Sequence, residues 1–141
     1  MTDPFKLQRF VDAQAPLRAQ VERELAAGRK TTHWMWFVFP QLRGLGRSAT
    51  AQHFGLGSLA EAVAYWQHPV LGPRLLADTQ RVLAVPQRRA DAIFGTPDDL
   101  KFHSSMSLFA RAAPTEAAFS QALERFFAGR ADTATLALLG D

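Results

Sequence analysis

The chain has 141 residues, a formal net charge of +3 at pH 7, 48% hydrophobic residues and no cysteine. This composition fits one folded domain and excludes a disordered chain, and the longest apolar run, residues 34–39, is too short to cross a membrane. Without cysteine there is no disulfide, thiol nucleophile or thiolate metal ligand, and without a basic block nucleic acid is disfavoured as a partner.

The first four residues contain neither a basic stretch nor an apolar one, so the sequence shows no secretory signal. We therefore expect a cytoplasmic protein with no membrane partner, and the sequence does not define its oligomeric state. Thirteen arginines against three lysines, together with abundant alanine, indicate a GC-rich bacterial genome. Lysine is consequently the unusual cation in this chain, and Lys30 and Lys101 stand out.

Helix signals dominate the first half of the chain. Asp3 is a predicted N-cap with Pro4 at the first helical position, and a second helix is expected between Pro16 and Gly28. Residues 34–39 are apolar on both faces, so their periodicity fits a buried strand or a buried helix. Because no other β-rich segment could pair with a strand, we favour a helix of about two turns that ends before the following proline.

The second half of the chain predicts further short helices. Their start and stop signals are a Ser58–Glu61 capping box, Pro69, Gly95 after Ala90–Phe94, Thr96-Pro97-Asp98-Asp99 with Thr96 as N-cap, Gly129 after Phe119–Phe127, and Asp132. No internal repeat or linker interrupts the pattern. We therefore predict that residues 1–141 form a single all-α domain, a compact orthogonal bundle of about eight to ten short helices.

The segment His33-Trp34-Met35-Trp36-Phe37 holds two of the three tryptophans in the chain. On a helix Trp34 and Trp36 lie about 200° apart, so they cannot both face one core layer. We expect one ring to pack in the core and the other to line a cavity, where its indole N–H needs a partner. His33 is a helix cap, a ligand contact or a structural histidine.

A glycine turn follows, with the sequence Gly44-Leu45-Gly46-Arg47-Ser48-Ala49. Its spacing fits the loose dinucleotide fingerprint, but that site needs a preceding strand, which the helix-rich surroundings disfavour. Two interpretations remain open. The turn either brings backbone close to an anion held by Arg47 and by a short helix from Arg47 to about His53 with Ser48 as its cap, or simply turns a corner between helices.

Lys101, Ser104 and Ser105 share one face of the predicted helix after Thr96, and large apolar residues occupy another face. The serines either let two helices pack closely or join Lys101 in holding an anionic or polar ligand. A lysine–serine pair for nucleophilic catalysis lacks an oxyanion hole and an orienting group, so we assign no catalytic residue. The four histidines show no metal-ligand spacing, and neither a metal nor a cofactor is predicted.

Characteristic phrases run in order along nearly the whole chain. They include Leu7-Gln8-Arg9-Phe10, Gly28-Arg29-Lys30, His33-Trp34-Met35-Trp36-Phe37, Phe39-Pro40-Gln41, Gly44-Leu45-Gly46-Arg47-Ser48, His68-Pro69 and Ser104-Ser105-Met106. In these phrases the chain resembles the bacterial and fungal proteins grouped as domain of unknown function 1810. The resemblance implies a single-domain all-α fold and no established activity. Some members carry the label calpastatin, which this sequence does not support, because a calpain inhibitor is expected to be disordered and acidic.

The motifs together predict a protein that binds an anionic small molecule, nucleotide-like or phosphorylated, and they leave open whether the protein also processes this molecule. The predicted ligand-binding residues are Lys30, His33, Trp34, Trp36, Gln41, Gly44, Gly46, Arg47, Ser48, Lys101, Ser104 and Ser105. They combine cationic and polar groups with an aromatic wall, and we expect them to line one pocket despite their separation in the sequence. The alternative is a protein–protein interaction module without catalytic activity, with exposed indole rings in an apolar patch.

Overall fold

Ten α-helices and two short 3₁₀ helices make up the computed structural model, which describes residues 2–140. The α-helices are α1 (Gln8–Gln14), α2 (Arg18–Ala27), α3 (Met35–Val38), α4 (Ala49–Phe54), α5 (Leu59–Gln67), α6 (Leu71–Ala84), α7 (Ala90–Phe94), α8 (Asp98–Ala112), α9 (Ala117–Phe127) and α10 (Thr133–Leu139). The 3₁₀ helices are η1 (Ala15–Leu17) and η2 (Arg43–Leu45). Within residues 2–140 the β-structure is limited to an isolated parallel bridge between Leu42 and Leu56. The predicted all-α class is confirmed.

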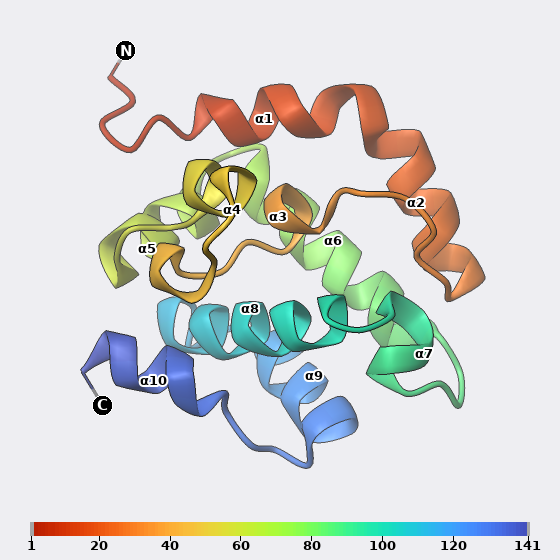
Figure 1. Cartoon of the computed structure of the whole chain (residues 1–141). Coiled ribbons are helices and arrows are strands. Elements are labelled where there is room, and N and C mark those ends of the chain that lie inside the picture. The colour runs from red at the N-terminus through yellow and green to blue at the C-terminus, as the bar shows by residue number, and fades with distance from the viewer. Residues whose placement is uncertain (1, 141) are drawn as a thin grey trace.

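Helix α8 lies at the centre of the bundle and packs against α5, α7, α9 and α10. Figure 1 shows α1 across the top of the molecule, α3 and α4 beneath it, α8 across the middle, and α9 and α10 below. One hydrophobic core joins these layers and takes side chains from Leu7, just before α1, through to Leu123 in α9. Layers of short helices around one core are the arrangement expected of an orthogonal bundle.

Phe102 of α8 holds the centre of an aromatic cluster. Its side chain is fully buried, and its ring centroid lies 4.6 Å from that of Phe94, 5.1 Å from that of Phe39 and 6.0 Å from that of Phe126. These rings come from α7, from the end of the aromatic run and from α9. Because aromatic rings bury large apolar areas, the cluster fixes the first half of α8 against three neighbouring segments.

Several predicted helix caps are confirmed. The hydroxyl of Ser48 accepts the Ala51 N–H at 3.1 Å at the start of α4, and that of Ser58 accepts the Glu61 N–H at 3.1 Å at the start of α5. Gly28 ends α2 in the left-handed region, at φ +72°. These short polar and glycine signals act within one turn of backbone, which is why the sequence alone predicts them.

The predicted start of the first helix is wrong. Helix α1 begins at Gln8 rather than Pro4, because Lys6 adopts a left-handed backbone (φ +55°) that a right-handed helix cannot include. Asp3 still caps the first turn, since its carboxylate accepts the N–H groups of Leu7 at 2.8 Å and Gln8 at 2.9 Å.

Two later starts also differ from the prediction. Helix α8 begins at Asp98, with Pro97 rather than Thr96 in the N-cap position. Helix α6 begins at Leu71 rather than at Pro69, and the ring Nδ1 of His68 accepts the Leu71 N–H at 3.2 Å. Both prolines lie in the turn before the helix, where their missing N–H costs nothing.

The aromatic run forms a helix, as favoured, but α3 spans one turn rather than two. It ends at Val38 because Phe39 leaves the helical region (φ −124°, ψ 75°) in front of Pro40. The two indoles differ in burial as expected, but the indole N–H that has a hydrogen-bond partner is that of the buried Trp34, which donates to Glu24 Oε1 at 3.0 Å. Trp34 is fully buried, whereas Trp36 is half-buried.

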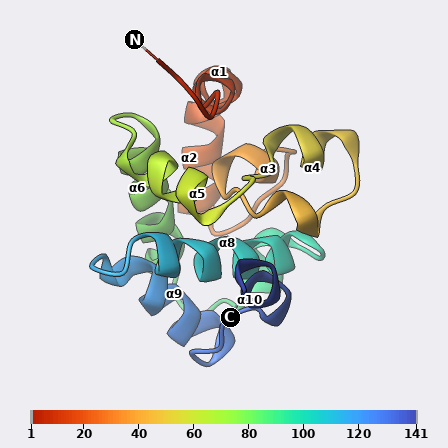
Figure 2. The same cartoon turned by 90° about the vertical axis from the view of Figure 1, so that its left-hand side faces the viewer.

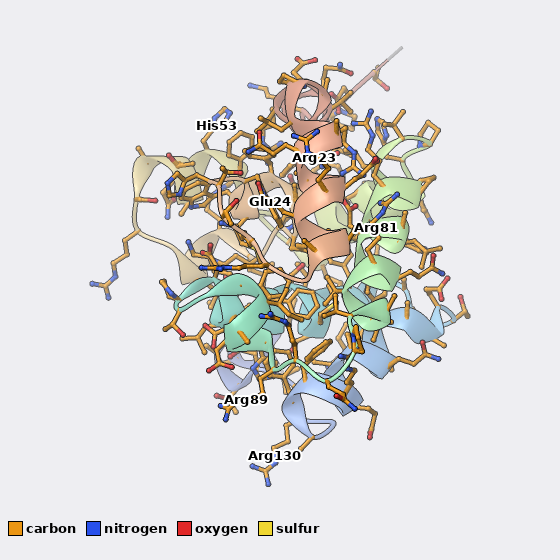
Figure 3. The ribbon with its side chains drawn as sticks, turned by 90° about the vertical axis from the view of Figure 1, so that its right-hand side faces the viewer. Arg23, Glu24, His53, Arg81, Arg89 and Arg130 are labelled. Carbon is orange, nitrogen blue, oxygen red and sulfur yellow. The ribbon has the colours of Figure 1, made fainter. Side chains whose placement is uncertain are left out.

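Glu24 of α2 fastens the segment that leads into α3, and Figure 3 shows it between α2 and that segment. Its carboxylate accepts the N–H groups of Thr31 at 2.7 Å and Thr32 at 3.1 Å, the Thr32 hydroxyl at 2.6 Å and the indole N–H of Trp34 at 3.0 Å. Burial raises the pKa of Glu24, but these hydrogen bonds outweigh burial and lower it to about 2. The carboxylate is therefore ionised at neutral pH and stabilises the fold.

Candidate functional site

A hollow of about 420 Å³ opens between the glycine turn and the first half of α8, and we call it the α4–α8 hollow. Figure 2 shows α3 and α4 above α8 and α10, and residues of these four helices contribute to the lining. Its lining residues are Trp36, Gln41, Leu45, Gly46, Arg47, Ser48, Ala51, Pro97, Leu100, Lys101, Ser104, Asp132 and Ala134. A volume of this size is typical of a small-molecule site.

Arg47 contributes to the hollow a positive charge that is not paired with another residue of the described range. Its side chain is exposed and makes no hydrogen bond or ion pair with any other residue in the described range. The turn that carries it is fixed from both sides, because Arg43 Nη2 donates to the Gly55 carbonyl at 3.1 Å and Gln52 Nε2 donates to the Gly46 carbonyl at 2.5 Å. A guanidinium that is free while its backbone is held suits a bidentate phosphate or carboxylate.

Lys101 brings a second cation and an aromatic wall from α8. Its Nζ lies 4.9 Å from the ring centroid of Trp36 and 3.4 Å from Asp98 Oδ1. Asp98 Oδ2 also binds Lys30 Nζ at 2.8 Å, so one carboxylate is shared between both lysines. The three groups therefore keep a net charge of about +1, and Lys101 holds it at the edge of the hollow.

Ser104 and Asp132 form the polar floor between α8 and α10. The Ser104 hydroxyl lies 3.1 Å from Asp132 Oδ2 and 3.1 Å from the Leu100 carbonyl oxygen, and its one proton is shared between these two acceptors. The Asp132 N–H in turn donates to the hydroxyl of Ser107 at 2.8 Å. Asp132 therefore caps α10, as predicted, and also lines the hollow. The sequence signal of a helix cap did not indicate this second position.

The chain as a whole matches the family model described as "Protein of unknown function (DUF1810)" over residues 4–139. The chain belongs to the DUF1810 family. The crystal structure of the conserved hypothetical protein Rv1873 from Mycobacterium tuberculosis is similar to this family member, with 55% identity, 99% of each chain covered and a TM-score of 0.97. A comparison with curated proteins finds no match. The resemblance seen in the tryptophan-rich and glycine-rich phrases is confirmed.

Seven of the twelve predicted ligand-binding residues of this DUF1810 protein line the α4–α8 hollow, although they come from two distant parts of the sequence. They are Trp36, Gln41, Gly46, Arg47, Ser48, Lys101 and Ser104. Gly46 also has a packing reason to be glycine, because a Cβ there would lie 2.4 Å from the Cβ of Ala51. The corner and the anion-site interpretations of the turn are therefore compatible.

The structure places the other five predicted residues outside the hollow. Lys30 forms an ion pair with Asp98, and the indole N–H of Trp34 donates to Glu24. His33 is exposed and does not line the hollow. Gly44 faces α10, where a Cβ would lie 3.1 Å from Leu138 Cδ1.

Ser105, the fifth of these residues, is fully buried on the core side of α8, where its Oγ has no hydrogen-bond partner in the described range. Adjacent serines on a helix point about 100° apart, so Ser104 reaches the hollow and Ser105 does not.

Two acidic residues that matter to the hollow were not predicted as part of it. Asp98 and Asp132 carry sequence signals of helix starts, and both indeed lie at helix starts. Asp98 lies beside Lys101 because the two are three residues apart on α8, whereas only the packing of α10 against α8 brings Asp132 beside Ser104. Among residues 2–140, no three histidine or acidic side chains gather as around a metal ion. No helix in the same range is long and apolar enough to span a membrane.

Proposed function

We propose that this DUF1810 protein binds a phosphorylated small molecule in the α4–α8 hollow. The observation that carries the proposal is the convergence of Arg47 and Lys101 on one hollow beside the Trp36 ring. Arg47 would bind the phosphate directly, because it has no competing partner within the described residues. Lys101 would add its charge while Asp98 and Trp36 hold its side chain in place.

Binding is better supported than any particular reaction. Asp132 and Ser104 are the groups nearest to an acid–base or nucleophilic pair, and both are engaged in the α8–α10 contact. The Asp132 oxygen that faces Ser104 is already bound by Thr135, and the described lining offers no oxyanion hole beside them. The proposal therefore covers recognition of the ligand, in a cytoplasmic setting, and assigns no catalytic residue.

A protein partner remains the alternative from the sequence, and it would need exposed aromatic surface. Trp34, Phe37 and Phe39 are all buried in the described structure, so the aromatic run does not offer that surface. A partner would have to bind elsewhere, and we give preference to the small molecule.

The test is a thermal-shift and calorimetric comparison of phosphorylated ligands, with AMP as the first probe. A ligand present at about one hundred times its Kd should raise the free energy of unfolding by about 2.7 kcal/mol, and Tm by roughly 10 °C. Arg47→Gln should weaken AMP binding by roughly tenfold or more, because a charge-assisted hydrogen bond is lost. It should leave the stability of the free protein within about 0.5 kcal/mol of the original.

Arg23→Gln is the matched control, since it removes the same charge from an exposed arginine of α2 that does not line the hollow (Figure 3). We expect it to keep the original affinity for AMP. If both variants lose the same affinity for AMP, the ligand responds only to the net charge of the protein and not to Arg47, which would contradict the proposal. If no phosphorylated probe binds, the proposal is refuted.

A further inference from the structure

We infer that the ligand carries free hydroxyl groups beside its phosphate, and that the Asp132 carboxylate binds them. This inference rests on the proposed function and specifies the second half of the same ligand. It narrows the ligand to a phosphate ester of a polyhydroxylated sugar, which includes ribonucleoside monophosphates and sugar phosphates.

Asp132 has one oxygen fully occupied and one oxygen free. Oδ2 accepts the hydroxyls of Ser104 at 3.1 Å and Thr135 at 2.6 Å and the Thr135 N–H at 3.0 Å. Oδ1 accepts no hydrogen bond from the described residues and is not a buried atom, so it reaches solvent. Asp132 is one of the residues that line the hollow, and we take Oδ1, its oxygen without a partner, to be the acceptor that a ligand meets there.

As the cap of α10, Asp132 uses only Oδ2, and a phosphate alone would leave Oδ1 without a hydrogen-bond donor. The lining contains two cations, Arg47 and Lys101, and Lys101 already shares its charge with Asp98. A carboxylate beside them repels a phosphate and lowers its affinity. That loss is recovered when the same ligand donates hydrogen bonds to Oδ1, because hydrogen bonds to an ionised acceptor are among the stronger ones.

Hydroxyl groups are the donors that fit the rest of the hollow best. A positively charged donor group on the ligand would be repelled by Arg47 and Lys101, whereas a hydroxyl group donates a hydrogen bond without carrying a charge. The Trp36 ring and the side chain of Leu100 give the hollow apolar walls on which a sugar or a base can pack. The volume of about 420 Å³ also exceeds what a lone phosphate ion fills.

The test compares AMP with 2′,3′-dideoxyadenosine monophosphate by calorimetry on the whole protein. The original protein should bind AMP roughly ten times more tightly or better, because the dideoxy ligand leaves Oδ1 without a donor. Asp132→Asn should remove this preference and also strengthen binding of the dideoxy ligand, since the repelling charge is gone. Asparagine is as good a helix N-cap as aspartate, so α10 should stay folded.

Thr135→Val is the matched control, because it removes a donor to Oδ2 and leaves Oδ1 untouched. It should keep the preference for AMP even if Tm falls. Ribose 5-phosphate against AMP distinguishes the two sources of the ligand: equal affinity indicates a sugar phosphate, and stronger AMP binding indicates a nucleotide. Equal binding of AMP and its dideoxy form by the original protein overturns the inference while the proposed function stands. Failure of all phosphate esters to bind overturns both.

Discussion

Replacing Phe102 by alanine is expected to lower the free energy of unfolding by about 3–5 kcal/mol. The ring is fully buried and contacts the rings of Phe39, Phe94 and Phe126 from three other segments. Its removal loses the transfer free energy of the ring and leaves a cavity that four packed segments can close only in part. The free energy of unfolding of a domain of this size is about 5–15 kcal/mol in total, so the variant should be marginally stable.

Urea denaturation followed by far-ultraviolet circular dichroism measures this loss. Leu100→Ala is the control on the same helix, because Leu100 is 57% exposed and should cost less than about 1 kcal/mol. A loss below about 1 kcal/mol for Phe102→Ala would contradict the central place given to this ring. The result also bears on the hollow, since Phe102 anchors the turn of α8 that carries Lys101.

Glu24→Gln is expected to cost about 2–3 kcal/mol at pH 7. The original carboxylate accepts four hydrogen bonds from Thr31, Thr32 and Trp34, and glutamine keeps the shape but loses the charge and one acceptor oxygen. Hydrogen bonds to a charged acceptor are worth more than neutral ones, and the replaced oxygen now presents an N–H group to the Thr32 hydroxyl.

The stabilisation by Glu24 should depend on pH in one direction. The pKa of Glu24 falls from 4.5 to about 2 on folding, which corresponds to about 3 kcal/mol of stabilisation. Because the folded pKa is the lower one, this stabilisation is complete above pH 4.5 and is lost as the pH falls towards 2. The difference in stability between the original protein and Glu24→Gln should therefore shrink between pH 5 and pH 2, as measured by urea denaturation.

Glu22→Gln is the control for this pair of measurements. Glu22 lies on the same helix, but its side chain is 45% exposed, and within residues 2–140 it makes only ion pairs with Arg18 and Arg81, at 3.3 Å and 3.7 Å. Exposed ion pairs contribute little, so its loss should stay below about 1 kcal/mol. Equal losses for Glu22→Gln and Glu24→Gln would contradict the role assigned to the buried carboxylate.

Signals that act within one helical turn could be predicted from the sequence. Ser48, Ser58 and Asp132 cap their helices as expected because a hydroxyl or carboxylate binds N–H groups two or three residues away. The prediction failed at Pro4, where it had no sign of the left-handed backbone at Lys6. It also overestimated α3, since apolar residues on every face indicate burial but not helix length.

The hollow could be predicted only in part. The sequence singled out Lys101 because lysine is rare in this chain and Arg47 because it lies in the glycine turn, and folding brings both to one lining. The sequence did not show which of the predicted side chains form hydrogen bonds or ion pairs with other residues of the protein and are therefore not free to bind a ligand. Lys30 and Trp34 are held by Asp98 and Glu24, contacts that depend on how distant segments pack and that no local pattern encodes.

The most direct test of the α4–α8 hollow as a binding site is a titration of the isotope-labelled protein with AMP, followed by proton–nitrogen correlation NMR. The indole signal of Trp36, assigned with Trp36→Phe, should shift saturably together with the backbone amides of Arg47 and Lys101. The indole signals of Trp34 and Trp66, which do not line the hollow, should stay in place. A spectrum that AMP leaves unchanged, or changes only around Trp66, would contradict the site.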